Sequence, residues 1–115
     1  MDAVIYKIMS KTAWDEARAA GVFLGAPVDL ADGYIHFSTG SQVRETAAKH
    51  FAGLTDLVLV AVATEPLGAA LRWEPSRGGA LFPHLHGRLD PAAATEVVDL
   101  PLGPDGRHRF PEKIP

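Results

Sequence analysis

Two short segments of this sequence hold the residues whose chemistry stands out. Residues 33–39, Gly-Tyr-Ile-His-Phe-Ser-Thr, carry an imidazole and a hydroxyl, and residues 82–88, Phe-Pro-His-Leu-His-Gly-Arg, place His84 and His86 two positions apart. Histidine titrates near neutrality and can accept or donate a proton without a cofactor. The two segments therefore predict a site for acid–base chemistry, provided that the fold brings them side by side.

Alternation along the first segment assigns its side chains to two faces. In a strand over residues 34–38, Tyr34, His36 and Ser38 share one side, while Ile35 and Phe37 face the core. Ser38 is a candidate for binding a ligand hydroxyl or phosphate, and a hydrogen bond to the backbone at a strand end is the equal alternative. Because no Gly-x-Ser-x-Gly motif is present, a serine hydrolase is not indicated.

Charged residues near the second segment could bind or orient a ligand. Glu74 is the carboxylate that we expect to orient a hydroxyl or stabilise positive charge; the alternative is an exposed strand residue paired with Arg72. Arg72 and Arg88 can bind a phosphate or carboxylate through charge-assisted hydrogen bonds, although a lone arginine is more often a solvated surface cation. The sequence thus predicts an anion-binding side to the site.

A metal centre is the alternative use of the imidazoles. His84 and His86 share one side of an extended segment, and His36 could supply a third ligand to a zinc ion with an open position. No helical His-Glu-x-x-His motif is present, and the chain has no cysteine, which excludes thiol nucleophiles and cysteine-ligated metals. We therefore predict hydrogen-bonded, metal-free histidines and assign no metal ligand.

Length and composition limit the class of protein. The 115 residues, 47% hydrophobic and 22% charged, predict one soluble domain with a core at about 4–100 and a C-terminal hairpin or tail at 101–115. The net charge of −3 predicts no general nucleic-acid or anionic-membrane binding. Residues 57–63, the longest apolar run, fall far short of the roughly 20 residues of a membrane span, and no signal peptide is indicated. We expect a cytoplasmic protein.

Periodicity and turn residues indicate the elements that must position the two segments. Alternating and β-branched residues predict strands at 4–9, 34–38, 57–63, 71–74 and 95–100, with 57–63 buried on both faces. Capping-box spacings, at Thr12 and at Thr39, precede two predicted N-terminal helices at 13–20 and 40–52. Residues 22–32 are predicted to form a loop, and residues 103–106 a turn that returns 107–110 as a hairpin strand. This pattern favours an α+β fold with a mixed, largely antiparallel sheet.

Several motifs together resemble a known family. The order and spacing of these motifs are similar to those of the small bacterial proteins grouped as domain of unknown function 952. The motifs are residues 5–8, 33–38 and 82–87, together with Trp14, Gln42, Phe51, Trp73 and Glu74. The resemblance covers residues 4–89 and extends more weakly to Phe110. Its most specific parts are Gly-Tyr-Ile-His-Phe-Ser and Phe-Pro-His.

The resemblance implies a fold similar to the ADP-ribosyltransferases and RNA 2′-phosphotransferases, with a split sheet that holds NAD in active relatives. It implies a nucleotide-type ligand in a histidine-lined cleft, with NAD as a candidate substrate and no cofactor assigned. Where that superfamily's first strand offers histidine or arginine to the ligand, this sequence has Lys7, and Glu74 and Glu96 are both imperfect matches to its catalytic glutamate. Fold resemblance does not establish a transferase, so enzyme activity stays open.

The hypotheses can now be stated together. The leading one is an ADP-ribosyltransferase-like domain that binds NAD, ADP-ribose or another nucleotide-type ligand. The alternatives are a noncatalytic binding module or homodimer, and a histidine-based metal-dependent hydrolase; the chain alone does not distinguish a monomer from a homodimer. The predicted catalytic residues are His36, Glu74 and His84, and the predicted ligand-binding residues are Lys7, Tyr34, Ser38, Arg72, His86 and Arg88.

Overall fold

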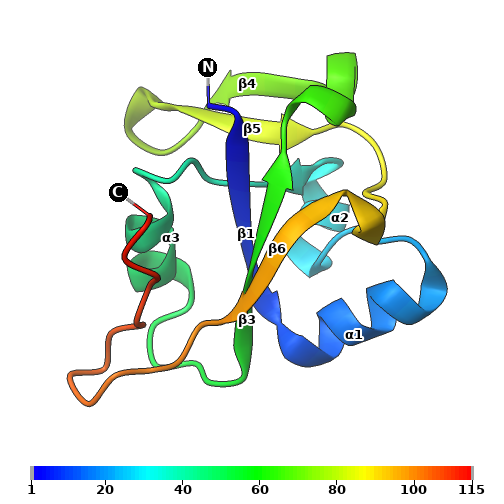
Figure 1. Ribbon diagram of the computed structural model, residues 1–115. Helices are drawn as coiled ribbons and strands as arrows, with labels where there is room; N and C mark the ends of the chain where they lie inside the picture. The colour runs from blue at the N-terminus through cyan, green and yellow to red at the C-terminus, as the bar shows by residue number, and fades with distance from the viewer. Residues whose placement is uncertain (1, 115) are drawn as a thin grey trace.

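Two three-stranded sheets form the framework of the computed structural model, which describes residues 2–114 apart from the side chain of residue 77 (Figure 1). The first sheet has the order β1-β3-β6, from Val4–Ser10, Leu57–Ala63 and Ala94–Asp99. The second has the order β2-β5-β4, from Ile35–His36, Leu81–Leu85 and Leu71–Pro75. The α+β class and the division of the strands into two sheets are as predicted. The expected mixed sheet is not formed, because every strand pair in the described residues is antiparallel.

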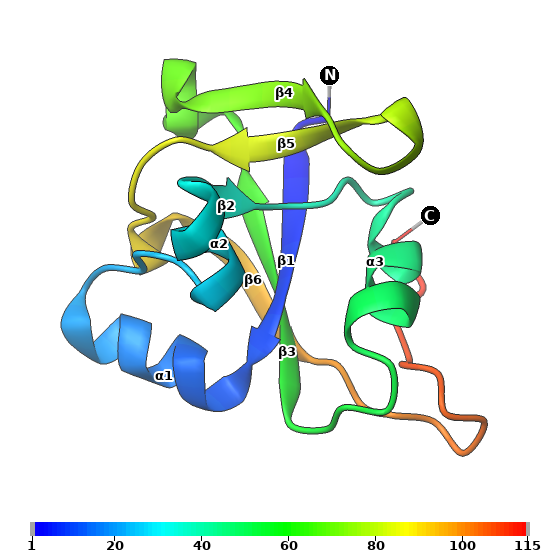
Figure 2. The same ribbon diagram turned by 180° about the vertical axis from the view of Figure 1, so that it is seen from behind.

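The residues after β2 join the two sheets. Tyr6 N donates to Ser38 O and Ser38 N donates to Tyr6 O, both at 2.8 Å, while Phe37 N donates to Pro83 O at 3.0 Å. In Figure 2 the chain leaving β2 crosses β1 on its way to α3. The predicted strand at 34–38 is therefore divided: it pairs with β5 at its start and with β1 at its end.

Among the described residues of the N-terminal half there are three α-helices, rather than the two predicted: α1 Lys11–Ala20, α2 Pro27–Asp32 and α3 Val43–His50. The short helix α2 lies in the predicted loop at 22–32. It starts with a proline at a position where a helix needs no backbone donor, and the Asp29 carboxylate accepts from Ala26 N at 2.7 Å. Gly33 ends α2 with φ 88°, a conformation that glycine adopts without strain.

The predicted helices at 13–20 and 40–52 correspond to α1 and α3 with shifted ends. The cap of α1 is Ser10, whose Oγ accepts from Ala13 N at 3.1 Å, and not the predicted Thr12. At α3, the predicted pair is present in one direction, since Gln42 Oε1 accepts from Thr39 N at 3.0 Å. Cap side chains thus decide the boundaries that apolar periodicity leaves open.

Apolar clusters cover both faces of the first sheet. One cluster packs α1 and the second sheet against Ile5, Val60 and their neighbours, and it includes Trp14. The other packs α3 and the C-terminal segment against Leu59, with Ile114 2% exposed. As predicted, β3 is buried on both faces.

Within the described residues, no helix has the length and apolar character needed to cross a membrane. The residues after β6 double back, with an isolated bridge between Leu102 and His108 in place of the predicted strand at 107–110. The division of the chain into a core at about 4–100 and a tail at 101–115 stays a prediction.

Candidate functional site

A row of polar side chains crosses the second sheet. In the register of this sheet, His36 lies opposite His84, and His84 lies opposite Arg72. Directly opposite residues of an antiparallel pair put their side chains on the same face. The alternate residues, Ile35 and Leu85, pack into the first apolar cluster. The structure therefore brings the two predicted segments together on the outer face of this sheet.

The Tyr34 ring packs among three imidazoles. Its centroid lies 4.2 Å from that of His84 in a stacked arrangement, 4.7 Å from His36 and 5.1 Å from His86. Burial raises the pKa of the Tyr34 hydroxyl, and the nearby carboxylates of Asp32 and Glu74 raise it further. The hydroxyl therefore stays protonated at neutral pH and can donate a hydrogen bond.

A buried carboxylate that the sequence analysis missed orients His36. Asp29 is 1% exposed, and its Oδ1 accepts from Nδ1 of His36 at 2.7 Å and from the His36 backbone N at 3.1 Å. Burial acts to raise the pKa of Asp29, but the Lys7 charge and hydrogen bonds from His36 and from the backbone lower it overall. Because the ionised carboxylate can only accept, His36 donates through Nδ1.

Lys7 holds Asp29 from the core side. Its Nζ lies 3.1 Å from Asp29 Oδ2 and donates to the carbonyl oxygen of His36 at 2.8 Å, and the residue is 7% exposed. Burial lowers the pKa of the Lys7 ammonium, and the Asp29 charge opposes that shift. Although Lys7 is predicted to bind ligand, the structure places its charge against Asp29 behind the imidazole of His36.

The second ring nitrogen of His36 faces Asp32. Nε2 lies 2.9 Å from Asp32 Oδ2, and the Asp32 side chain is 46% exposed at the end of α2. Because Nδ1 already donates to Asp29, Nε2 donates to Asp32 only when the ring carries its second proton. Since Asp32 is exposed, its side chain can turn away and leave Nε2 to a ligand.

Glu74 binds the other two imidazoles. Its Oε1 lies 2.8 Å from Nδ1 of His84 and 2.8 Å from Nε2 of His86. Hydrogen bonds from His86 and His84 lower the pKa of Glu74, so the carboxylate is ionised and accepts from both rings. The alternative pairing of Glu74 with Arg72 is not formed.

His84 keeps one nitrogen for a ligand. Burial lowers its pKa more than Glu74 raises it, so the ring is neutral near pH 7 with its proton on Nδ1. Among residues 2–114, no side chain or backbone group bonds to Nε2 of His84, and no fully buried side-chain nitrogen lacks a partner. Within the described residues Nε2 therefore keeps its lone pair free of protein partners, in a residue that is 2% exposed.

The remaining predicted residues divide between the site and the interior. Arg72 and Arg88 are exposed, and neither guanidinium forms an ion pair with a carboxylate in the described part of the chain. The Ser38 side chain is buried, and its hydroxyl lies 2.8 Å from Thr46 Oγ1 of α3. The structure thus keeps Arg72 with the histidines and places Ser38 outside this cluster.

The histidines do not turn free nitrogens to a common centre. Nδ1 of His36, Nδ1 of His84 and Nε2 of His86 each face a carboxylate oxygen. Among residues 2–114, no group of three or more histidine, aspartate or glutamate side chains could hold a metal ion. A metal bound by these nitrogens would have to displace the carboxylate contacts.

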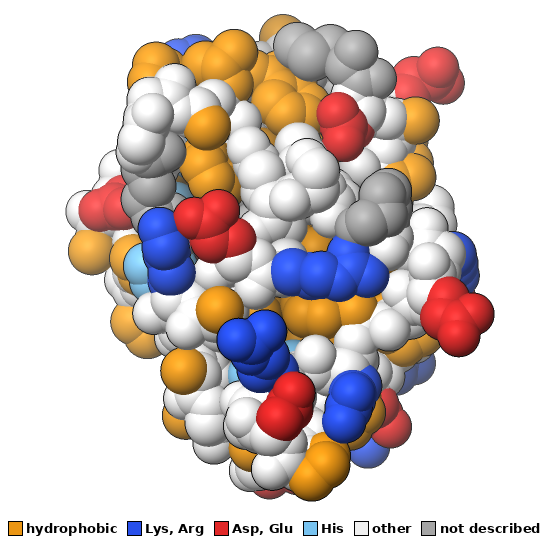
Figure 3. Space-filling model, turned by 90° about the vertical axis from the view of Figure 1, so that its left-hand side faces the viewer, with side chains coloured by type: hydrophobic (Ala, Val, Ile, Leu, Met, Phe, Trp, Pro, Cys, Tyr) orange, Lys and Arg blue, Asp and Glu red, His pale blue; other side chains and the backbone are white. Residues whose placement is uncertain are grey.

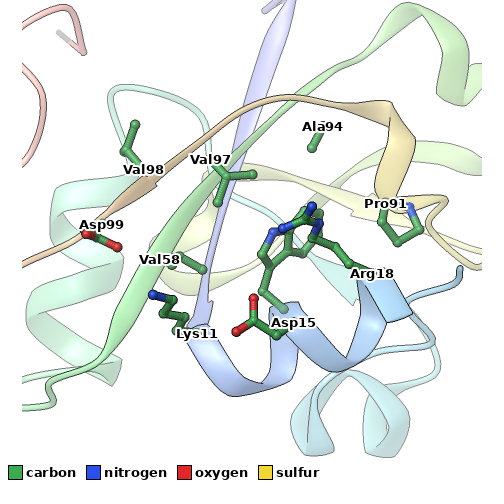
Figure 4. A pocket seen from close by; sticks show the side chains of 10 residues that line it. Lys11, Asp15, Arg18, Val58, Pro91, Ala94, Val97, Val98 and Asp99 are labelled. Atoms are coloured by element: carbon green, nitrogen blue, oxygen red, sulfur yellow. The ribbon is translucent and has the colours of Figure 1, made fainter. Parts of the chain in front are cut away.

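Two hollows lie apart from this row. One of about 410 Å³ lies between α1 and β6, where Lys11, Asp15 and Arg18 rise towards Val97 (Figure 4). The other, of about 630 Å³, lies between α3 and the C-terminal segment. Neither hollow is lined by His36, His84 or Arg72. These two hollows are therefore not the predicted histidine-lined cleft, which stays a prediction.

Comparison with known proteins places the chain in a family. The sequence model of the family described as "Protein of unknown function (DUF952)" matches residues 8–97. The crystal structure of protein CC0527 from Caulobacter crescentus is 55% identical, covers 92% of this chain and 93% of that chain, and has a TM-score of 0.89. The solution NMR structure of CC0527 is also 55% identical, covers 92% of this chain and 91% of that chain, and has a TM-score of 0.84. No curated protein matches the chain. The chain therefore belongs to the DUF952 family, as its motifs indicated.

Proposed function

We propose that the outer face of the second sheet binds a phosphate-bearing, nucleotide-type ligand, and that His84 and His36 move protons on it without a metal. The observation that carries this proposal is the single row of Arg72, His84 and His36, in which a carboxylate holds Nδ1 of each imidazole. Arginine binds phosphate through charge-assisted, often bidentate hydrogen bonds. The resemblance to ADP-ribosyltransferases makes NAD and ADP-ribose the first ligands to test.

His84 is the proposed general base. Its neutral ring carries a proton on Nδ1 and presents Nε2 to a ligand hydroxyl. Glu74 fixes the tautomer and the ring orientation, and it stabilises the imidazolium that forms when Nε2 takes the proton. His86 donates to the same Glu74 oxygen and thereby helps to hold that carboxylate in place.

His36 is the proposed acid. Its ring lies between Asp29 and Asp32, and in the doubly protonated form Nε2 can donate to a ligand oxygen once Asp32 turns away. The rings of His36 and His84 lie 5.4 Å apart, centroid to centroid. In a phosphoryl transfer, His84 would take the proton of the attacking hydroxyl as its oxygen bonds to phosphorus, and His36 would give its Nε2 proton to the leaving oxygen as the other P–O bond breaks.

Calorimetric titration of untagged protein with NAD, ADP-ribose and inorganic phosphate tests the binding step. Arg72→Ala should weaken binding about 10–100-fold, because a hydrogen bond to a charged group contributes about 1.5–3 kcal/mol. Arg18→Ala, an exposed arginine of α1, is the matched control and should bind normally. If no ligand gives heat, and His36→Ala leaves every ligand-induced thermal shift unchanged, the proposal fails.

A noncatalytic binding module is the second candidate, and exposed apolar side chains favour it. Leu24, Val28 and Leu30 are 63%, 57% and 63% exposed, on or next to the helix that supplies Asp29. A partner protein or a second copy of the chain would cover them. Light scattering after size exclusion separates the two candidates, because a stable homodimer without nucleotide turnover supports this one.

A further inference from the structure

Basic side chains gather around the hollow between α3 and the C-terminal segment. The hollow has a volume of about 630 Å³, and its lining includes Arg44, Arg107 and Arg109 but no acidic residue. Figure 3 shows the face with α3 and the C-terminal segment, where Lys and Arg side chains border an exposed apolar area. Because the whole chain has a net charge of −3, this gathering runs against the overall charge.

The floor of the hollow is formed by apolar side chains, most of them small. Ala47, Ala48 and Ala52 line it from α3 and its end, and methyl side chains leave room above the helix. Phe110 lines it from the C-terminal segment, with the Arg44 guanidinium 5.2 Å from the ring centroid. Arg44 Nη2 also donates to the carbonyl oxygen of residue 114 at 2.7 Å, which fixes this cation in place.

A tight turn positions the other two arginines. Gly103 N donates to Arg107 O at 2.7 Å, and Arg109 N donates to Pro101 O at 2.8 Å. Nε2 of His108 lies 2.8 Å from the Leu54 carbonyl oxygen and ties the turn to the segment before β3. These bonds fix the backbone on both sides of Arg107 and Arg109.

Gly103 also makes room for the Arg109 side chain. A Cβ added at position 103 would clash with Nε of Arg109 and lie 3.0 Å from its Cζ. The guanidinium therefore lies in a space that only glycine leaves open. A side chain at position 103 would therefore displace the Arg109 guanidinium from its present place.

Within the described residues, a carboxylate near Arg107 and Arg109 is that of Asp105, whose pKa is lowered by a backbone hydrogen bond from Arg107 and by the charges of both arginines. Neither guanidinium forms an ion pair there, and Asp105, the acid of the same turn, accepts instead from the Arg107 backbone N at 3.0 Å. Two guanidiniums beside a hollow can bind one anionic group together, since each presents a planar fork of donors.

We infer that this hollow binds a small molecule that carries a phosphate group on an apolar or aromatic body, at a site separate from the histidine row. The guanidiniums match the phosphate, and the alanines with Phe110 match the body. The volume lies within the range of about 300–1,000 Å³ typical of small-molecule sites. A carboxylate head would meet the same donors, so the test compares the two kinds of anion.

Phenyl phosphate is the probe, titrated into the full chain by calorimetry and by amide NMR. We expect shifts at residues 44–52 and 103–110, and weaker binding of inorganic phosphate and of benzyl alcohol, because each lacks one half of the ligand. Benzoate should also bind more weakly, because it offers fewer acceptor oxygens and less charge. Equal binding of benzoate would overturn the assignment to phosphate.

Two variants test the residues. Arg107→Ala with Arg109→Ala should lower the affinity for phenyl phosphate at least tenfold at this site, and Gly103→Ala should also weaken binding, because it displaces Arg109 without removing a charge. Arg72→Ala is the matched control and should leave the shifts at residues 44–52 unchanged, which separates this site from the histidine row. Shifts confined to β2, β4 and β5, or an unchanged affinity in the double variant, would overturn the inference.

Discussion

Replacing Asp29 with asparagine should destabilise the protein far more than the same change at Asp32, although both carboxylates bond to the His36 ring. The Asp29 carboxylate is buried and accepts from Lys7 Nζ, Ala26 N, and both His36 N and Nδ1. An asparagine keeps one acceptor oxygen, and its amide NH₂ faces donors in either orientation. Asp29→Asn also leaves the buried Lys7 ammonium without its counter-charge.

The size of the destabilisation by Asp29→Asn follows from the burial of the Lys7–Asp29 ion pair. Removing one partner of a buried ion pair costs about 3–5 kcal/mol, a large part of the roughly 5–15 kcal/mol that stabilises a typical domain. For a chain of this length the melting temperature should fall by about 10–30 °C. The Asp32 side chain is 46% exposed, so Asp32→Asn should change the free energy of unfolding by no more than about 0.5 kcal/mol.

Urea unfolding followed by circular dichroism measures both variants, and pH gives a second readout. The pKa of Asp29 is lowered in the folded state, so its stabilisation is complete above the unfolded value of about 3.9 and is lost as the pH falls through the lower folded value. The gap between wild type and Asp29→Asn should therefore shrink in acid. Equal stability of the two variants, or a gap that does not change with pH, would refute this account of the pair.

Two further outcomes follow from the same contacts. Gly25→Ala should lower the free energy of unfolding by about 1–3 kcal/mol, because φ is 132° and an added Cβ would lie 2.8 Å from Cβ of Asp29. Gly21 is also at positive φ but has open space around it, so Gly21→Ala should lower the free energy of unfolding by less. Thermal unfolding measures both variants. Glu74→Gln should lower the pKa of His84 further, because it removes the carboxylate charge that opposes burial; NMR titration of the ring protons checks the direction, and a raised pKa would contradict the proposed dyad.

The parts of the fold that depend on local pattern could be predicted from the sequence. Burial on both faces requires an apolar run, so β3 was identified with its boundaries, and alternation placed His36 and Ile35 on opposite faces. The α2 helix was missed because its six residues have no apolar period. It is instead marked by a proline at its start and the Asp29 carboxylate that accepts from Ala26 N, which also occur in loops.

The sequence predicted which residue types form the site, but not which side chains bond to one another. Glu74 was expected either to serve the site or to pair with Arg72, and alternation could not decide, because both side chains share a face of β4. The outcome depends on the register of β4 against β5, which brings Glu74 within 2.8 Å of two imidazoles. Register between strands distant in sequence is set by tertiary packing, which a local pattern does not contain.

Lys7 was the signal that could have identified Asp29. A lysine in an otherwise apolar strand must be paired if it is buried, so some carboxylate had to reach it. The structure supplies Asp29, and the same carboxylate oxygen that lies 3.4 Å from Lys7 Nζ accepts from Nδ1 of His36 at 2.7 Å. The tautomer of His36 is therefore set from the core side of the sheet, before any ligand arrives. A ligand on the outer face meets an imidazole whose Nδ1 is already occupied, so any proton that His36 gives to that ligand must come from Nε2.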